Sequence, residues 1–182
     1  MSTRSTKELS LFSYEILGLI GRDGAGAHDL RRMVERGRLL AWAGESQYYV
    51  EPKRLAKLGY LDARTEPGRT RQRTVYGLTV KGRAALRDFA ASPARMTPLK
   101  SEALIRMLIA DLVGEAPTST SIASLREEIA SLLIQLEDAD AAADALPHRA
   151  KYLRLNNSFL RRFLNLHLDW IDEVERELDA AA

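Results

Sequence analysis

The stretch SQYYVEPKRLAKLGYLDARTEPGRTRQRTVYGLTVKG, residues 46–82, is the most informative part of the chain about its fold. Amide, hydroxyl and cationic side chains open it in a helical pattern, which ends at Gly59. A short strand pattern follows, then a turn at Pro67 and Gly68 with a basic tip, and then a second strand pattern that ends before Thr79. A helix, a two-stranded hairpin and the start of another helix, in this order, predict a winged helix.

Two helical patterns precede this stretch. The first is rich in apolar residues and ends near Gly21, and a Gly/Ala-rich turn at residues 23–26 leads to the second. The apolar residues expected on one side of the second helix are Leu30, Met33 and Val34. Helix, turn, helix, connector and recognition helix is the order of a helix-turn-helix, so the first half predicts a winged helix-turn-helix with a two-stranded wing.

The middle of the chain contains the expected domain boundary. Thr79 is a good N-cap for a fourth helix, and Ser92-Pro93 ends that helix. Residues 92–98 include two prolines and form the expected linker. We therefore predict a mostly α fold with a winged helix-turn-helix DNA-binding domain over residues 1–91 and a helical dimerisation domain over residues 99–182.

Every pattern in the second half is helical. Thr97 and Pro98 are typical of a helix start, Gly114 of a helix end, and residues 117–120 of a loop. Farther along, apolar residues recur at alternating steps of three and four, at Ile122, Leu125, Ile129, Leu132, Leu136, Ala139, Ala143 and Leu146. This heptad spacing predicts a left-handed coiled-coil seam.

The closing helix, expected from about His148 to Leu178 after a break at Pro147, is apolar over most of its girth. The helix that precedes it in the sequence can cover only one stripe of such a helix. Its remaining apolar surface therefore favours contact with a second chain. We therefore predict an antiparallel helical pair over residues 122–178 that forms a homodimer. The alternative is a monomeric bundle in which residues 99–113 cover the second stripe. The residues predicted at the dimer interface are Ile122, Leu125, Ile129, Leu132, Leu136, Phe159, Phe163, Trp170, Ile171 and Val174.

The charge of the chain is unevenly divided. Residues 1–91 have 17 Lys and Arg against 10 Asp and Glu, a net charge of +7, and residues 92–182 have 10 against 15, a net charge of −5. A basic first half favours binding to a polyanion. There is no cysteine, so disulfides, thiolate metal sites and cysteine nucleophiles are excluded.

Other signatures are missing from the sequence as well. The three histidines have no metal-ligand spacing, and there is no phosphate loop or nucleophile elbow, so we expect no enzyme, metal site or cofactor. The amino-terminal residues have no apolar signal core, and no apolar run is long enough to span a bilayer. These observations favour a cytoplasmic protein without membrane contact.

Three motifs in the first half resemble one known family. They are SQYY at residues 46–49, LAKLGYL at residues 55–61 and YGLTVKG at residues 76–82. They are similar to the SQxY-type recognition helix, the LxxLGxL ending and the YxLTxKG wing strand of the PadR family of bacterial transcription regulators. The second half resembles, by its architecture, the virulence-activator-type dimerisation domain of the larger PadR members. The resemblance covers about residues 10–178. It implies a dimeric, sequence-specific DNA-binding repressor that a small molecule releases.

Two positions depart from the PadR pattern. Pro52 stands where the family has an apolar helix former such as Leu. Either the recognition helix kinks there, or its regular part begins near Val50 and Glu51. Residues 27–30, Ala-His-Asp-Leu, stand where the family often has Gly-Tyr-Asp-Leu.

Residue types and the resemblance together give the predicted DNA contacts. Amide and hydroxyl side chains at a recognition-helix edge suit base readout in the major groove, and Gln47 is the candidate to bond an adenine. Cations on the helix and at the wing tip suit phosphates or the minor groove. Of the two adjacent tyrosines, Tyr49 is expected to turn inward. The full predicted set is Ser46, Gln47, Tyr48, Tyr49, Lys53, Arg54, Arg69, Arg71 and Arg73.

An effector site is predicted because release of a repressor requires a ligand that prefers one dimer geometry. The aromatic residues that suit a flat ligand are Tyr14, Phe163 and Trp170, and the arginines that suit its acidic group are Arg154, Arg161 and Arg162. Core packing is the alternative explanation of the same aromatic residues. For the whole chain, the alternative function is a winged-helix protein–protein adaptor without base readout.

Overall fold

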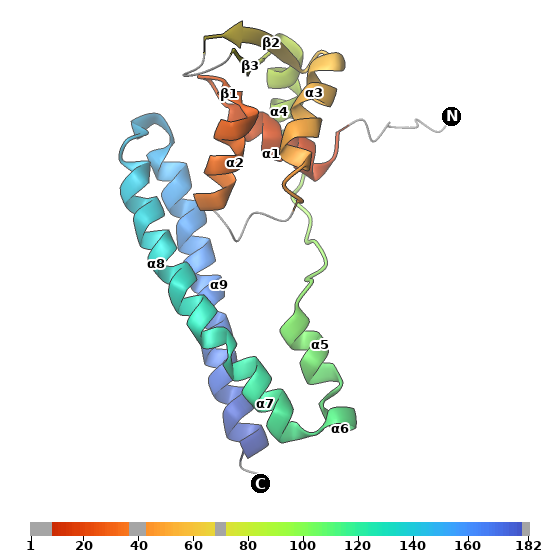
Figure 1. Cartoon of the computed structure of the whole chain (residues 1–182), viewed down its shortest axis with the longest axis vertical. Coiled ribbons are helices and arrows are strands. Elements are labelled where there is room, and N and C mark those ends of the chain that lie inside the picture. The colour runs from red at the N-terminus through yellow and green to blue at the C-terminus, as the bar shows by residue number, and fades with distance from the viewer. Residues whose placement is uncertain (1–8, 37–42, 68–71, 180–182) are drawn as a thin grey trace, which may run out of the picture. The chain divides into compact units, whose positions relative to one another are not determined.

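The structure is a computed structural model that describes residues 9–36, 43–67 and 72–179 (Figure 1). The chain divides between Arg95 and Met96 into two compact units, called unit 1 and unit 2 below. Arg69 and Arg71, two of the predicted DNA contacts, lie outside the described residues.

Unit 1 combines helices with a small antiparallel sheet. Its helices are α1 (Leu11–Ile20), α2 (Ala27–Arg36), α3 (Gln47–Lys57) and α4 (Val80–Ala91). Its strands are β1 (Ala25–Gly26), β2 (Leu61–Glu66) and β3 (Arg73–Leu78), and the sheet that they form within the described residues has the order β1-β3-β2. The helix-turn-helix of α2 and α3 and the wing hairpin of β2 and β3 confirm the predicted winged-helix fold.

Local signals set the ends of α1 and α4. The Ser10 hydroxyl accepts a hydrogen bond from the Ser13 amide, and the Ser13 hydroxyl accepts one from the Ser10 amide, which makes a capping box at the start of α1. Gly21, with φ 59°, ends α1. Thr79 caps α4 by accepting a hydrogen bond from the Gly82 amide, as the sequence predicts.

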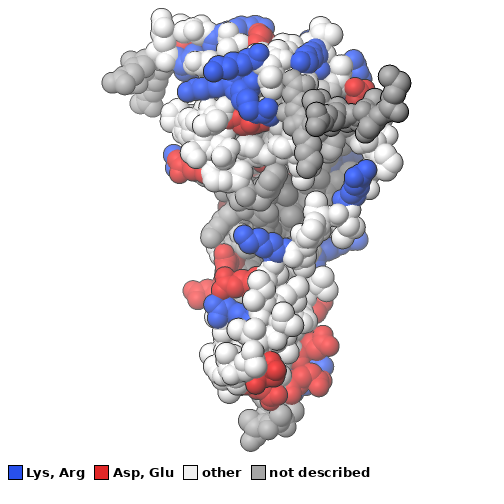
Figure 2. All heavy atoms as spheres, turned by 90° about the vertical axis from the view of Figure 1, so that its right-hand side faces the viewer, with Lys and Arg blue, Asp and Glu red and all other residues white. Residues whose placement is uncertain are grey.

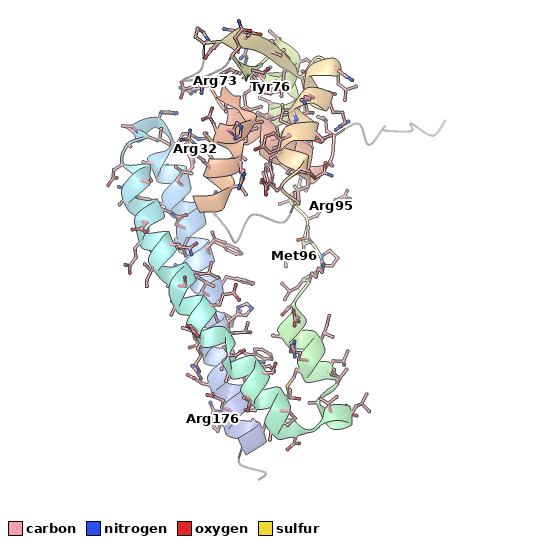
Figure 3. The ribbon with its side chains drawn as sticks, viewed as in Figure 1. Arg32, Arg73, Tyr76, Arg95, Met96 and Arg176 are labelled. Atoms are coloured by element: carbon pink, nitrogen blue, oxygen red, sulfur yellow. The ribbon has the colours of Figure 1, made fainter. Side chains whose placement is uncertain are left out.

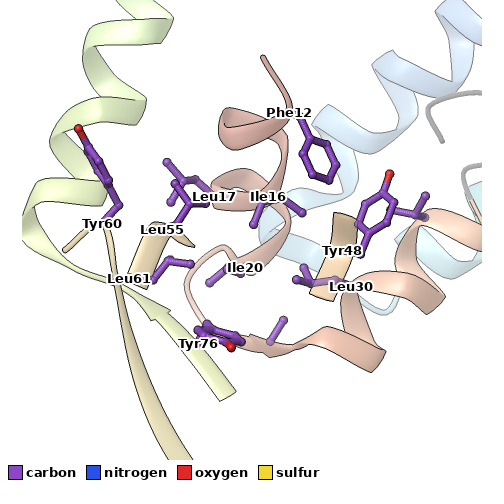
Figure 4. Packing of buried hydrophobic residues seen from close by; sticks show 12 residues of the cluster. Phe12, Ile16, Leu17, Ile20, Leu30, Tyr48, Leu55, Tyr60, Leu61 and Tyr76 are labelled. Carbon is purple, nitrogen blue, oxygen red and sulfur yellow. The ribbon is translucent and has the colours of Figure 1, made fainter. Parts of the chain in front are cut away.

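The core of unit 1 lies between α1, the helix-turn-helix and the wing (Figure 4). Its buried side chains include Ile16, Leu17 and Ile20 of α1, Leu30 of α2, Leu55 of α3, and Leu61 and Tyr76 of the wing. Burial of each large apolar side chain stabilises the fold by about 1.5–3 kcal/mol. Met33, predicted on the buried side of α2, is instead 43% exposed, because Leu30 and Val34 already fill the core side of that helix.

β1 is a feature that the sequence does not reveal. A turn is expected there, but Ala25 and Gly26 pair with Tyr76 and Val75 of β3. The described sheet therefore has one short strand more than the predicted two-stranded wing. Small residues permit this approach: a Cβ at Gly24, whose φ is +78°, would lie 2.9 Å from the Tyr76 carbonyl oxygen.

α3 begins at Gln47 and includes Pro52, so the second of the two alternatives, in which its regular part begins near Val50 and Glu51, is wrong. The amides of Tyr49 and Val50 donate to the Ser46 carbonyl oxygen at 3.1 and 3.2 Å, which starts the helix before the proline. Proline has no amide hydrogen for the helical ladder, but the Pro52 ring is fully buried in unit 1. Burial of this apolar ring offsets part of the free energy that is lost with the missing helical hydrogen bond.

Unit 2 is built from helices. They are α5 (Glu102–Leu108), α6 (Ala110–Val113), α7 (Glu115–Ala123), α8 (Leu125–Ala143) and α9 (Pro147–Asp179). α7 and α8 pack along α9 (Figure 1). The side chains buried in unit 2 include Ile122, Ile129, Leu132, Leu136 and Ala143 of the predicted heptad, and Leu160, Leu164, Ile171 and Val174 of α9. The heptad seam is thus formed within one chain.

Polar side chains hold α8 and α9 in an antiparallel pair. Near the start of α8, Arg126 donates to Glu175 of α9 at 2.6 Å. Near the end of α8, Asp140 accepts hydrogen bonds from Asn157 and Arg161 at 2.7 and 3.0 Å. Because Asn157 is buried, its bond to Asp140 favours one register of the two helices.

Two predictions for unit 2 are wrong. The helix expected from Thr97 begins at Glu102, because the Ser101 side chain provides the N-cap. Residues 117–120, expected to form a loop, lie inside α7. Proline is tolerated in the first turn of a helix, where its missing amide hydrogen has no helical acceptor, so Pro117 does not end α7.

Candidate nucleic-acid interface

α3 exposes a polar and cationic edge. The exposed side chains on this edge include Ser46, Gln47, Lys53 and Lys57. The buried side chains of the same helix are Tyr48, Glu51, Pro52 and Leu55. Hydroxyl, amide and ammonium groups on one edge of a helix suit a DNA groove, where bases form the floor and phosphates line the walls.

The inward-facing tyrosine of α3 is Tyr48, and not Tyr49 as the sequence predicts. Tyr48 is 2% exposed, its ring packs edge-on against Phe12 at 5.1 Å, and its hydroxyl donates to Glu15 Oε1 at 3.3 Å. Burial, together with the charge and the hydrogen bond of Glu15, raises the pKa of Tyr48 to about 12. Tyr48 therefore anchors α3 to α1 and does not lie on the exposed edge.

Tyr49 lies at the contact between α2 and α3, where it is half-buried. Its hydroxyl is 3.3 Å from His28 Nδ1, and the two rings meet edge-on with their centroids 5.6 Å apart. His28 occupies the second of the two positions that depart from the PadR pattern. The Tyr49–His28 contact thus joins the two helices of the helix-turn-helix.

A buried carboxylate connects α1 to α3. Glu51 accepts a hydrogen bond from the Ser13 hydroxyl at 2.7 Å and two from the Arg54 guanidinium at 2.7 and 2.8 Å. Arg54 also donates to Ser13 Oγ at 3.1 Å. Burial alone would raise the pKa of Glu51, but the hydrogen bonds from Arg54 and Ser13 and the charge of Arg54 outweigh it and hold the pKa below its ordinary value. Glu51 is therefore ionised at neutral pH.

This network gives Arg54 partners that the prediction from sequence missed. Arg54 is predicted to contact phosphates, but its guanidinium is held by Glu51 and Ser13, and its side chain is 40% exposed. Lys53 and Lys57 keep exposed side chains. The three-residue spacing of Glu51 and Arg54 on a helix permits their contact, and this spacing was the available sequence signal. Phosphate binding by Arg54 stays a prediction.

Asp29 ties the start of β3, at the tip end of the wing, to α2. Its carboxylate accepts hydrogen bonds from the Gly26 amide at 3.1 Å, from Arg32 at 2.6 Å and from Arg73 at 3.3 Å. Figure 3 labels Arg32 and Arg73, the two arginines of this contact. Burial works against ionisation of Asp29, but these donors outweigh it and lower its pKa. Arg73 also pairs with Glu66 across the hairpin at 3.4 Å. The predicted phosphate contact of Arg73 would therefore compete with two carboxylates.

The end of α3 is joined to the start of α4. Lys81 Nζ donates to the Leu58 carbonyl oxygen at 2.8 Å and lies 4.1 Å from the centre of the Tyr60 ring. The Thr79 hydroxyl lies 2.8 and 3.0 Å from the carbonyl oxygens of Gly59 and Tyr60. The LAKLGYL and YGLTVKG motifs therefore meet in space and position the recognition helix relative to the wing.

The predicted effector residues lie in both units, and their role stays a prediction. Tyr14 of α1 stacks on Phe89 of α4, with 4.1 Å between the ring centroids and 12° between the planes. Phe163 and Trp170 are half-buried on α9, and the Phe163 ring meets the His167 ring at 4.5 Å.

The residues predicted at the dimer interface differ in burial. The buried ones are Ile122, Ile129, Leu132, Leu136, Ile171 and Val174, and the half-buried ones are Leu125, Phe163 and Trp170. Phe159 is 68% exposed. The buried residues stabilise unit 2 itself, and the participation of the whole set in a dimer stays a prediction.

The two units together define a winged helix-turn-helix protein with an additional helical unit. In unit 1 the recognition helix exposes an amide and lysines, and in unit 2 the last helix is long. On the face shown in Figure 2, Lys and Arg side chains gather on unit 1, whereas Asp and Glu side chains are frequent on unit 2. Within the part of the chain that the structure describes, no helix has the length and apolar character needed to cross a membrane.

Solved structures with this fold include PadR and PadR-like transcriptional regulators. Bacillus subtilis PadR in complex with operator DNA has a TM-score of 0.78 at 18% identity, over 93% of this chain and 98% of that one. The Vibrio cholerae virulence activator AphA has a TM-score of 0.72 at 24% identity, over 93% and 99% of the two chains. Bacillus subtilis PadR in complex with p-coumaric acid has a TM-score of 0.69 at 19% identity, over 93% and 99%.

The fold of this chain is therefore PadR-type, and the resemblance suggested by the three sequence motifs is confirmed at the level of the fold. No protein-family profile matches the chain, and no curated protein matches it.

Proposed function

We propose that this chain is a dimeric transcription regulator that binds operator DNA through α3 and the wing, represses transcription and is released by a small aromatic effector. The exposed edge of α3 supports DNA binding most directly. There, Gln47, Lys53 and Lys57 are exposed on a helix whose other side is anchored by Tyr48 and Glu51. Among the similar solved structures, Bacillus subtilis PadR is in complex with operator DNA in one and with p-coumaric acid in another.

The test of DNA binding uses the full-length protein and two duplexes. One duplex is recovered by the protein from a random-sequence pool, and the other is a scrambled duplex of the same composition. A sequence-specific regulator should bind the first about 1,000-fold more tightly or better in a fluorescence-anisotropy titration. Affinity for both should fall with salt, because phosphate contacts release counterions. Failure to bind either duplex would contradict the proposal and favour the adaptor function.

Gln47→Ala is expected to reduce specific binding and spare non-specific binding. An amide can form two hydrogen bonds with an adenine edge, so the variant should lose about 1–3 kcal/mol on the selected duplex and little on the scrambled one. Gln135→Ala, in α8 of unit 2, is the matched control and should bind both duplexes as the wild type does. Equal losses on both duplexes would give Gln47 a role in positioning.

The proposed dimer is supported by apolar side chains that unit 2 leaves exposed. On α9 these side chains are Tyr152, Leu155, Phe159 and Leu166, at steps of three, four and seven residues, the spacing of one coiled-coil stripe. On α5, on α6 and at the residue between them they are Leu104, Ile105, Leu108, Ile109, Leu112 and Val113. An apolar surface of this extent favours association with another chain.

The double variant Leu155→Glu, Phe159→Glu is expected to be monomeric. Sedimentation equilibrium at micromolar concentration should give twice 20.4 kDa for the wild type and a single-chain mass for the variant. Operator affinity should fall by about 100-fold or more, because two linked winged helices no longer bind neighbouring half-sites together. Val80→Glu, at an exposed valine of unit 1, should remain dimeric. A monomeric wild type would refute the dimer.

The proposed effector is a planar aromatic acid. Titration with p-coumaric acid is expected to quench tryptophan fluorescence and to weaken operator binding over the same concentration range. Quenching with unchanged operator affinity would contradict release by this ligand class, and so would the absence of both responses.

A further inference from the structure

Val50 is an apolar residue in the middle of the exposed edge of α3. Its side chain is 56% exposed. The residues one turn before and after it, Gln47 and Lys53, are polar and exposed. Single exposed apolar side chains are common on soluble proteins, so the position of Val50 matters more than its exposure.

Helical geometry places Val50 opposite the buried side of α3. The buried side chains include Tyr48, Pro52 and Leu55. At about 100° per residue, Val50 lies roughly 140–160° around the helix from each of them. Arg54, on the next turn, has its guanidinium held by the buried carboxylate of α3 and by α1. The exposed row that remains consists of Gln47, Val50, Lys53 and Lys57.

Major-groove chemistry limits what Val50 can contact. Base edges in that groove offer hydrogen-bond donors and acceptors, which a valine side chain cannot use, and one apolar group, the 5-methyl group of thymine. We propose that Val50 is a specificity-determining residue that contacts the 5-methyl group of a thymine. This inference rests on the proposed function, in which α3 enters the major groove.

The position of this thymine relative to the base bonded by Gln47 follows from the spacing along the helix. Val50 is one turn from Gln47, a rise of about 4.5 Å for three residues. Base pairs rise by about 3.4 Å along the duplex. The thymine contacted by Val50 therefore lies within about two base pairs of the base contacted by Gln47.

The experiment removes one methyl group at a time from the DNA. The probe is the duplex that the full-length wild type recovers from a random-sequence pool, and each thymine is replaced singly by deoxyuridine, which lacks only the 5-methyl group. At the contacted position, loss of the methyl group should weaken wild-type binding about fourfold, the effect of losing one buried methylene-sized group. Val50→Ala should bind the thymine duplex about fourfold more weakly and should not respond to deoxyuridine at that position. Val50→Ile should respond as the wild type does.

Val80→Ala is the matched control, because Val80 is an exposed valine outside α3. It should keep the wild-type response at every position, and a far-UV circular dichroism melt should show that all variants remain folded. The proposal is overturned if no deoxyuridine weakens wild-type binding, or if Val50→Ala responds at each position as the wild type does. A wild type that recovers no duplex would contradict the proposed function, and the inference would fall with it.

Discussion

Replacing Gly82 with Ala is expected to destabilise the protein by about 3 kcal/mol, the upper end of the usual cost of overpacking. A Cβ at Gly82 would lie 2.2 Å from the Tyr60 carbonyl oxygen. That oxygen cannot move away without loss, because it accepts a hydrogen bond from the Thr79 amide at 3.2 Å and lies 3.0 Å from the Thr79 hydroxyl. Urea denaturation followed by circular dichroism, at one protein concentration, measures the change.

Gly18→Ala is the control for this substitution. Gly18 lies inside α1, and apart from its chain neighbours and the backbone of its own helix no described atom lies within 4 Å of a Cβ built there. Alanine is the better helix former, so this variant should be more stable than the wild type by about 0.5–1 kcal/mol. Two variants of equal stability would contradict the close approach of α4 to Tyr60.

Glu51→Gln is expected to cost about 2 kcal/mol, because hydrogen bonds that involve a charged group contribute about 1.5–3 kcal/mol. The amide keeps the size of the carboxylate, but it loses the charge that holds Arg54 and one of the oxygens that accept its hydrogen bonds. Glu66→Gln is the matched control, since Glu66 is a more exposed glutamate that pairs with Arg73 at 3.4 Å. It should change stability by less than about 0.5 kcal/mol.

The effect of Glu51→Gln should depend on pH. The pKa of Glu51 is lower in the folded protein than in the unfolded chain, so its charge stabilises the fold fully above the unfolded pKa. This contribution is lost as the pH falls below about 4.3, the ordinary value of a glutamate, and through the lower folded pKa. Denaturation of the wild type and the variant at pH 7 and at progressively acidic pH should give a stability gap that narrows. A gap that stays constant would refute ionised Glu51 as its source.

The parts of unit 1 that could be predicted from the sequence have strong local signals. Thr79 has a side chain that caps a helix, and Gly21 adopts the positive φ that ends one, so these helix ends depend on a few neighbouring residues. The wing hairpin was also predictable, because two strand patterns flank a turn.

The errors arise where distant contacts decide between local alternatives. Nothing near Tyr48 and Tyr49 in the sequence distinguishes them, and the structure buries Tyr48 because Phe12 and Glu15 of α1 lie beside it. From the sequence alone, Glu51 reads as a solvent-exposed helix residue. Its burial depends on Ser13, which is distant in the sequence and donates a hydrogen bond to it in the structure. A two-residue strand such as β1 is too short to show the alternation of apolar and polar residues by which a strand is recognised in a sequence.

The heptad pattern of unit 2 illustrates a different limit. Its spacing correctly predicts a helix with an apolar seam, but spacing cannot reveal which helix covers that seam. The structure covers it with α9 of the same chain. The exposed stripe that supports the proposed dimer lies on α9, and includes Leu155 and Phe159.

The short strand β1 has a consequence for exchanging parts between related regulators. Residues 24–26 approach the β3 backbone closely, and Asp29, a few residues later, binds Arg73 at the start of β3. The wing is therefore not a separable module. A chimera that takes its wing from a relative would also have to take the turn before α2 and the first turn of that helix, or it would lose a strand pairing and an ion pair together.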